Sequence, residues 1–145
     1  MSSEVHSPKG PREGRILIVD DEDSIRKPIR IALVQAGYEV VEAADGQQAM
    51  VALTDGDNPL MVDAILCDIR MPRINGVDAI LFFRTQFPSI PVIVLTGYPD
   101  FDLAISLMKL GVRDYLVKPI LKQDLLRVLK CAVENHVLFK DQFVA

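Results

Sequence analysis

Residues 15–26 read RILIVDDEDSIR, and this stretch decides the fold. Its first five residues form a short apolar, β-branched run, which is typical of a buried strand. The run stops abruptly at four consecutive acidic residues, Asp20, Asp21, Glu22 and Asp23. A helical pattern begins at residue 24, so the stretch is predicted to form a strand, a polar loop and a helix.

The same order of patterns recurs along the chain. Apolar strands are predicted at DAILC (63–67) and PVIVL (91–95), and two more strands at residues 38–42 and 113–117. Helical patterns occupy residues 24–36, 47–53, 77–86, 101–110 and 123–137. Strands that alternate with helices through short loops indicate right-handed crossovers and a parallel sheet covered on both faces. The sequence therefore predicts an α/β domain with a doubly wound, five-stranded parallel sheet and five helices.

Length and composition fit one globular domain, with 145 residues of which half are apolar and a quarter charged. We expect a flexible tail at 1–14, a domain at 15–138 and an extension at 139–145. The net charge of −4 argues against direct nucleic-acid binding. The tail lacks the apolar segment of a signal peptide, and no apolar run reaches the roughly 20 residues of a membrane helix, so no membrane contact and a cytoplasmic location are expected.

The cysteines and histidines offer no obvious chemistry. Cys67 and Cys131 lie in apolar stretches without the spacing of a zinc site or a disulfide framework, and both are predicted to be buried free thiols. His6 and His136 have no partners at metal-ligand spacing and are predicted to lie on the surface. The functional groups are therefore expected among carboxylates, hydroxyls and amines.

Polar side chains of these kinds follow four of the predicted strands. The acidic run follows the first strand, Asp68 the third, Thr96 the fourth and Lys118 the fifth. Ligands of doubly wound sheets bind beyond the carboxyl ends of the strands, so we expect these groups to meet at one edge. Clustered carboxylates favour a hard divalent cation, and Mg²⁺ also accepts a phosphate oxygen. A phosphoryl group on Asp68 would be held by the metal, Thr96 and Lys118, which predicts transient aspartyl-phosphate formation.

The chain resembles the receiver domains of two-component response regulators. The resemblance rests on four motifs in the family's order and spacing, ILIVDDEDSIR, AILCDIRMPRINGVD, VIVLTGYPD and DYLVKP, and covers about residues 15–137. It implies a flavodoxin-like fold with strand order 2-1-3-4-5, and a phosphoryl group received from a sensor histidine kinase or a phosphotransfer protein with Mg²⁺ or Mn²⁺. It also implies a signalling face formed by helix 101–110, strand 113–117 and helix 123–137, and autodephosphorylation in place of steady enzymatic turnover.

The resemblance assigns the phosphoacceptor and the metal ligands residue by residue. Asp68 matches the phosphoacceptor, and Asp20 and Asp21 match the acidic pair that binds the metal. The backbone carbonyl of Arg70 would complete the protein ligands. The resemblance thus implies one metal site built from three carboxylates and one carbonyl.

The resemblance also assigns the groups that respond to phosphorylation. Lys118 would pair with the phosphoryl group, and the Lys118–Pro119 bond is typically cis in this family. Thr96 and Tyr115 match a switch pair, in which the hydroxyl moves to a phosphoryl oxygen and the ring turns inward. Arg70 and Tyr98 match positions that flank the phosphoryl group, and we hypothesise that their bulk lengthens the phosphorylated lifetime.

Two other functional classes stay open at this point. An Mg²⁺-dependent phosphohydrolase would use Asp68 as its nucleophile, but such enzymes usually carry a second acid two residues later, where this chain has Arg70. A flavin-binding electron carrier would need a Gly/Ser/Thr-rich turn after the first strand, where this chain has four acids. Both classes are therefore less favoured than the phosphorylation switch.

The sequence does not decide which partner reads the signal. A separate protein, an output domain and a second copy of the chain all remain possible. The apolar stripe of the last predicted helix continues through residues 137–144, which fits a partner surface or a linker. A homodimer would use charged residues near the last strand, namely Lys109, Arg113, Asp114 and Arg127.

Overall fold

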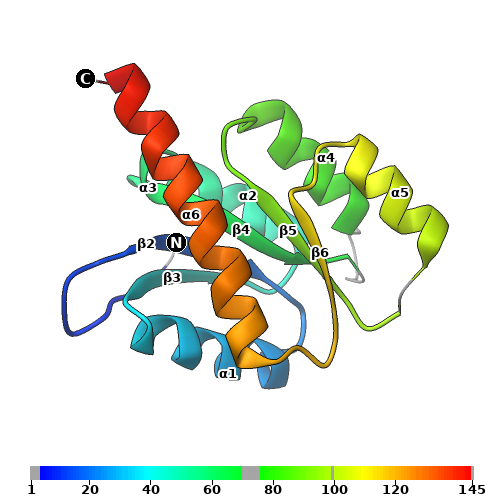
Figure 1. Cartoon of the computed structure of the whole chain (residues 1–145), viewed down its shortest axis with the longest axis horizontal. Helices are drawn as coiled ribbons and strands as arrows, with labels where there is room; N and C mark the ends of the chain where they lie inside the picture. The colour runs from blue at the N-terminus through cyan, green and yellow to red at the C-terminus, as the bar shows by residue number, and fades with distance from the viewer. Residues whose placement is uncertain (1–3, 70–75, 99, 145) are drawn as a thin grey trace.

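The structure is a computed structural model that describes residues 4–69, 76–98 and 100–144. These residues form one six-stranded sheet with the order β1-β3-β2-β4-β5-β6 (Figure 1). The strands are β1 (Val5–His6), β2 (Gly14–Val19), β3 (Tyr38–Ala43), β4 (Val62–Asp68), β5 (Val92–Thr96) and β6 (Asp114–Val117). The helices are α1 (Asp23–Gln35), α2 (Gly46–Thr54), α3 (Asn58–Met61), α4 (Gly76–Gln86), α5 (Phe101–Lys109) and α6 (Lys122–Val144).

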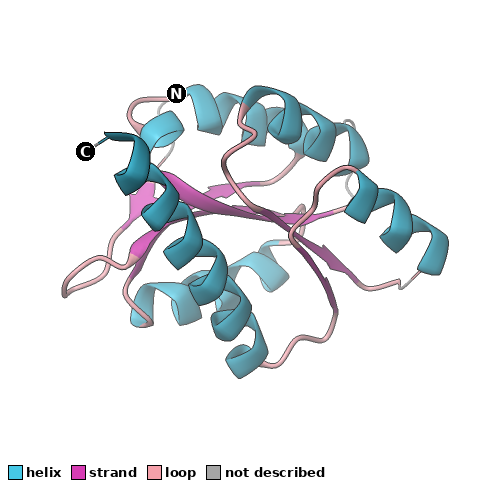
Figure 2. Cartoon of the chain, turned by 45° about the horizontal axis from the view of Figure 1, so that its top comes forward, coloured by secondary structure: helices cyan, strands magenta, loops and turns pink. Residues whose placement is uncertain are grey.

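The strands from β3 to β6 pair in parallel, and helices cover both faces of the sheet (Figure 2). On one face, α2, α4 and α5 bury side chains such as Leu53, Phe83 and Leu107 against β2, β4 and β5. On the other face, α1 and α6 bury side chains such as Leu33 and Leu129. The predicted doubly wound α/β class is therefore confirmed.

The prediction of five strands and five helices was too low, because the described residues contain six of each. The extra strand, β1, pairs antiparallel with β3 and lies within the segment expected to be a tail. The extra helix, α3, is a single turn in which the buried Asn58 side chain donates to the carbonyl of Ala52, at 2.8 Å. Both elements are too short to show a hydrophobic period, so the pattern of the sequence does not reveal them.

The two chain segments outside the predicted domain pack against it in different ways. Glu13 donates its backbone N–H to the carbonyl of Gly37 at 2.8 Å, and Val5 packs against the core. At the other end, α6 continues from the predicted last helix through the expected extension to Val144. No helix in the described part of the chain combines the length and apolarity that a membrane span requires.

The cysteine and histidine predictions hold only in part. Cys67 is a buried free thiol as predicted, and its burial raises its pKa. The prediction for Cys131 was wrong, since this free thiol is exposed on α6. The prediction for His136 was also wrong, because its side chain is buried.

A buried charge network explains where His136 lies. Asp63, at the start of β4, has its Oδ1 atom 2.9 Å from Nδ1 of His136 and 2.7 Å from Nζ of Lys140. Its Oδ2 atom accepts from the backbone N–H of Arg15, at 3.2 Å. Spacing of four residues places His136 and Lys140 on the same side of α6. Burial alone raises the pKa of Asp63, but the hydrogen bonds from His136 and Lys140 and the charge of Lys140 outweigh it and lower that pKa.

We predict that Asp63→Asn lowers the free energy of unfolding by about 2 kcal/mol at pH 7, because the partly exposed Lys140 ammonium and the buried backbone N–H of Arg15 lose their anionic partner. Since folding lowers the pKa of Asp63, its stabilisation is complete above the ordinary carboxyl pKa and is lost as the pH falls through the folded value. Urea denaturation between pH 7 and pH 3 should show the difference between wild type and variant shrinking with acidification. Asp124→Asn is the control, because in the described part of the chain the one ion pair of Asp124 is an exposed 3.7 Å contact with Arg127. Equal stability of wild type and Asp63→Asn would contradict this role.

Candidate functional site

Four chain segments meet at the carboxyl edge of the sheet. Asp20 and Asp21 follow β2, Asp68 is the last residue of β4, and Thr96 is the last residue of β5. Lys118 follows β6, and its backbone N–H donates to the carbonyl of Thr96 at 2.8 Å. Parallel pairing sets these ends side by side, since Asp68 pairs with Leu95 and Thr96 with Val117. The sequence prediction that these groups share one edge thus agrees with the geometry.

Lys118 joins the two buried carboxylates of this edge. Its Nζ atom lies 2.8 Å from Oδ2 of Asp68 and 3.1 Å from Oδ2 of Asp20. Burial alone lowers the pKa of Lys118, but the hydrogen bonds and charges of the two aspartates outweigh it and raise that pKa. The lysine is therefore an ammonium ion at neutral pH. The Lys118–Pro119 peptide bond that follows is cis.

Asp20 is the most deeply buried acid of the site, with no exposed surface. Burial raises its pKa, against the opposing hydrogen bonds from the backbone N–H of Glu22 and from Lys118, and Asp68 adds to the rise by charge repulsion. The N–H of Glu22 lies 2.9 Å from Oδ1 of Asp20, and Arg26 donates to the backbone carbonyl of Asp20. Residues at the start of α1 thus fix the position of a carboxylate whose ionisation is unfavourable.

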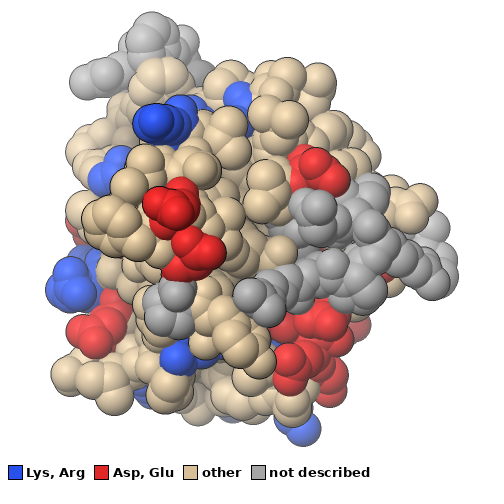
Figure 3. Space-filling model, turned by 90° about the vertical axis from the view of Figure 1, so that its right-hand side faces the viewer, with Lys and Arg blue, Asp and Glu red and all other residues tan. Residues whose placement is uncertain are grey.

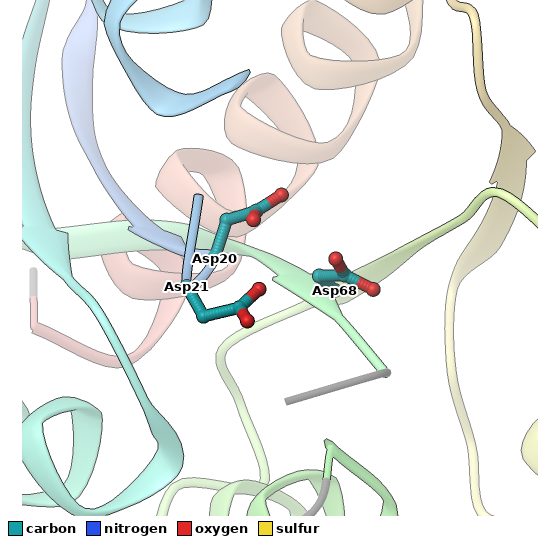
Figure 4. A group of neighbouring side chains, drawn as sticks. All are labelled: Asp20, Asp21 and Asp68. Carbon is teal, nitrogen blue, oxygen red and sulfur yellow. The ribbon is translucent and has the colours of Figure 1, made fainter. Parts of the chain in front are cut away.

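The carboxylates of Asp20, Asp21 and Asp68 form a group that could hold a metal ion. One oxygen from each residue lies within 4.8 Å of the others. Figure 4 shows the side chains of Asp20 and Asp21 extending from the end of β2 toward the side on which Asp68 lies. Two of the three residues are buried and Asp21 is exposed, so the group opens to solvent on one side. An oxygen donor set of this kind suits a hard divalent cation. Arg70, the fourth expected ligand, lies outside the described residues.

Most of the charge of this group lies below the surface, because two of its three carboxylates are buried. Figure 3, which views the molecule from the right-hand side of Figure 1, shows acidic side chains in several separate places, while most of that face is neither acidic nor basic. Among the described residues, this group sets three carboxylates against the ammonium of Lys118 and so carries excess negative charge. A free anion would be repelled there unless a cation were bound first.

The two residues assigned to the switch both contact the loop between β5 and α5. The buried hydroxyl of Thr96 lies 3.2 Å from the carbonyl of Tyr98 and accepts from the N–H of Tyr98 at 3.1 Å. The hydroxyl of Tyr115 accepts from the N–H of Asp100, at 3.3 Å. The Tyr115 ring is half-buried and packs against the core, whereas Tyr98 is 63% exposed. Thr96 and Tyr115 therefore hold opposite ends of one loop.

Sequence reasoning missed the role of Asp100 in this arrangement. Its carboxylate caps α5 by accepting from the N–H of Leu103 at 3.1 Å, while its own N–H contacts Tyr115. The signal was present, because an aspartate directly before a helical pattern is a typical N-cap. The contact with Tyr115 had no such signal, since it joins residues 15 positions apart.

Fold and site together define a doubly wound α/β domain with an acidic centre at the carboxyl ends of its strands. A family model described as the response regulator receiver domain matches residues 16–130. The chain therefore belongs to the receiver domains of two-component response regulators, as the motifs implied.

Known proteins agree with this membership. The chain is 32% identical over 127 residues to the regulatory protein AtoC of Escherichia coli K12, covering 88% of the chain and 27% of AtoC. It is 37% identical over 105 residues to the transcriptional regulatory protein ZraR of Klebsiella oxytoca, covering 72% of the chain and 23% of ZraR. The chain thus spans about a quarter of the length of these regulators.

A solved receiver domain from Clostridium thermocellum superposes with a TM-score of 0.76 at 33% identity, covering 90% of this chain and 98% of that one. The flavodoxin-like receiver fold expected from the motifs is therefore confirmed. The expected strand order 2-1-3-4-5 corresponds to β3-β2-β4-β5-β6 here, with β1 added outside β3.

We predict that Asp20→Asn raises the free energy of unfolding by up to about 1 kcal/mol at pH 7 without added metal. Folding raises the pKa of Asp20, so its ionisation costs stability as the pH rises above the ordinary carboxyl value. Urea denaturation in EDTA should show the gain of the variant at pH 7 and a smaller gain at pH 4. Asp21→Asn, at an exposed position, is the control and should leave stability nearly unchanged. A variant less stable than wild type at pH 7 would rule out an unfavourable buried charge.

Proposed function

We propose that this chain is a phosphorylation switch that receives a phosphoryl group on Asp68 from a sensor histidine kinase or a phosphotransfer protein. The observation that carries the proposal is the contact of Lys118 Nζ with Asp68, at 2.8 Å, inside a group of carboxylates that could hold a divalent cation. The membership of the receiver family supports the same chemistry. We place this exchange in the cytoplasm, where receiver domains meet their kinases.

Transfer needs a nucleophile and neutralisation of charge. A carboxylate oxygen of Asp68 attacks the phosphorus of a phosphohistidine, the P–N bond breaks, and its electron pair leaves with the imidazole. Lys118, now contacting Asp68 and Asp20, is placed to pair with a phosphoryl oxygen. Asp20, Asp21 and Asp68 would hold Mg²⁺, or Mn²⁺, which supplies positive charge to the transferred group. Water later hydrolyses the acyl phosphate, so the chain reacts once per signal and is no turnover enzyme.

The contacts of Thr96 and Tyr115 suggest how the signal would leave the site. A phosphoryl oxygen that accepts from the Thr96 hydroxyl would replace its bonds with Tyr98, and the loop before α5 would be released. Tyr115 contacts the other end of that loop at Asp100 and would turn inward with it. The response would therefore reach α5, β6 and α6.

The exposed face of α5 fits a partner-binding surface. It presents Phe101, Ile105 and Met108, which are 81%, 41% and 50% exposed and follow each other at helical spacing. We propose that an output domain or a separate protein partner reads this face, together with β6 and α6. The greater length of the regulators that the chain resembles supports an output domain.

We predict that incubation with a small phosphodonor and Mg²⁺ adds one phosphoryl group to the wild-type chain and none to Asp68→Asn, as measured by intact mass. Asp102→Asn serves as the control, since Asp102 is an exposed acid in the first turn of α5 and should be phosphorylated normally. Omission of Mg²⁺ should abolish the gain in mass. Phosphorylation of the Asp68→Asn chain would contradict the assignment, and steady donor hydrolysis by the wild type would favour the phosphohydrolase class.

We also predict that Tyr98→Ala shortens the phosphorylated lifetime several-fold, because the exposed ring lies two residues beyond Thr96 and would limit the approach of water. Arg70→Ala should act in the same direction. Loss of the phosphorylated mass over time, after removal of the donor, measures both effects. Phe101→Ala is the control, as it removes an even more exposed aromatic ring, 81% against 63%, that lies five residues beyond Thr96. An unchanged dephosphorylation rate in both test variants would refute the lifetime hypothesis.

A further inference from the structure

A groove lies along α6 at the amino-terminal edge of the sheet, opposite the acidic site. It consists of two adjoining cavities of about 790 and 450 Å³, which share Pro88, Ser89, Pro91 and Arg113. Pro91 directly precedes β5, and Arg113 directly precedes β6. We call this surface the α6 groove. We infer that it binds an acidic peptide segment of a partner protein.

The first observation is the charge of the groove. Arg84, Arg113 and Arg127 line its larger cavity, together with a single carboxylate, that of Asp114. The Asp114 carboxylate accepts from the backbone N–H of Tyr115, at 2.8 Å. Three guanidinium groups against one carboxylate make this surface positive on a chain whose net charge is −4. Such a surface attracts a negatively charged partner.

The second observation is that these arginines lack close carboxylate partners. Among the described residues, Arg84 and Arg113 have no carboxylate within 4.0 Å, and Arg127 has only an exposed contact at 3.7 Å. Arg113 contacts the Sγ atom of Cys131 at 3.8 Å. Other arginines of the described chain, by contrast, each contact a carboxylate: Arg12, Arg15, Arg26 and Arg30. The groove therefore concentrates guanidinium groups that are available for an anion.

The third observation is that Arg84 is held in place before any ligand arrives. Its Nε atom donates to the carbonyl of Leu110 at 3.3 Å, and its Nη1 atom donates to the carbonyl of Pro88 at 2.8 Å. Gly111, with φ of +91°, allows this arrangement, because a Cβ there would lie 3.0 Å from Nη2 of Arg84. A guanidinium has five N–H donors, so Arg84 still has N–H groups that can donate to a carboxylate after it has bonded the two carbonyls. An ordered cation loses little side-chain entropy on binding.

The shape of the groove favours a peptide over a small anion. From Arg127 to Phe139, α6 rises by about 18 Å, which an extended chain of about five or six residues would match. The cavity beyond Arg113 has more apolar walls, including Ala132 and Phe139. The groove thus fits acidic residues at one end and an apolar side chain at the other. The groove shares β6 and α6 with the partner-binding face proposed above, so the inference rests on that proposal and adds the chemistry of the partner.

A random hexapeptide library displayed on phage provides the test. We expect selection on the wild-type chain at low salt to enrich peptides that combine several acidic residues with a terminal apolar residue. A synthetic peptide of the enriched sequence should bind the Arg113→Glu, Arg127→Glu double variant at least about tenfold more weakly by fluorescence anisotropy. Lys130→Glu is the matched control, since Lys130 is exposed on the same helix but lies outside the groove. Raising the salt concentration should weaken wild-type binding.

Several results would overturn the inference. These are the absence of enriched peptides, enrichment of peptides without acidic residues, or equal loss of binding in Lys130→Glu and the double variant. Inorganic phosphate that displaces the peptide completely at micromolar concentration would show a small-anion site. Binding of the chain to anionic lipid vesicles with loss in the double variant, and no peptide binding, would show a lipid surface. All variants should still be phosphorylated on Asp68, which separates failure here from failure of the switch.

Discussion

The contact of Lys118 with two buried aspartates is the constraint on which the rest of the site depends. Charges that leave water are tolerated only when they are paired, and this ammonium is within 3.1 Å of both Asp20 and Asp68. The three residues come from the ends of three different strands, β2, β4 and β6, so the contact requires those ends to be aligned. Parallel register supplies that alignment, and the helices on both faces bury the apolar strands that carry the three residues.

The two edges of the sheet differ in how well their buried carboxylates are paired with cations and hydrogen-bond donors. At the carboxyl edge, three carboxylates share one lysine, and the pKa of Asp20 is raised by its burial. At the amino-terminal edge, Asp63 is matched by His136, Lys140 and a backbone donor, and its pKa is lowered. Excess negative charge at one edge favours a cation, and a bound cation would offset the charge of a phosphoryl group there. The matched network at the other edge holds α6 on the sheet.

Much of this arrangement follows from local sequence. Apolar runs that end at polar residues predicted the five main strands within one or two residues. Burial on both faces explains this for β2, β4 and β5, whereas β6 is only partly buried. His136 and Cys131 show where this reasoning fails. Both lie on α6. The sequence pattern does not reveal that His136 contacts Asp63, 73 residues away, or that Cys131 lines a groove. The short elements β1 and α3 exist through contacts with β3 and α2, and have no pattern of their own.

The sequence by itself determined the fold class, the family and the residues at the strand ends, since these depend on periodicity and on residue order. Only the tertiary structure decided that Lys118 contacts both Asp20 and Asp68, that Thr96 and Tyr115 hold the two ends of one loop, and that three arginines line one groove. The physical reason is distance along the chain. Side-chain hydrogen bonds and ion pairs act over a few ångströms, and the groups that form them here are brought together only when the sheet and its helices pack.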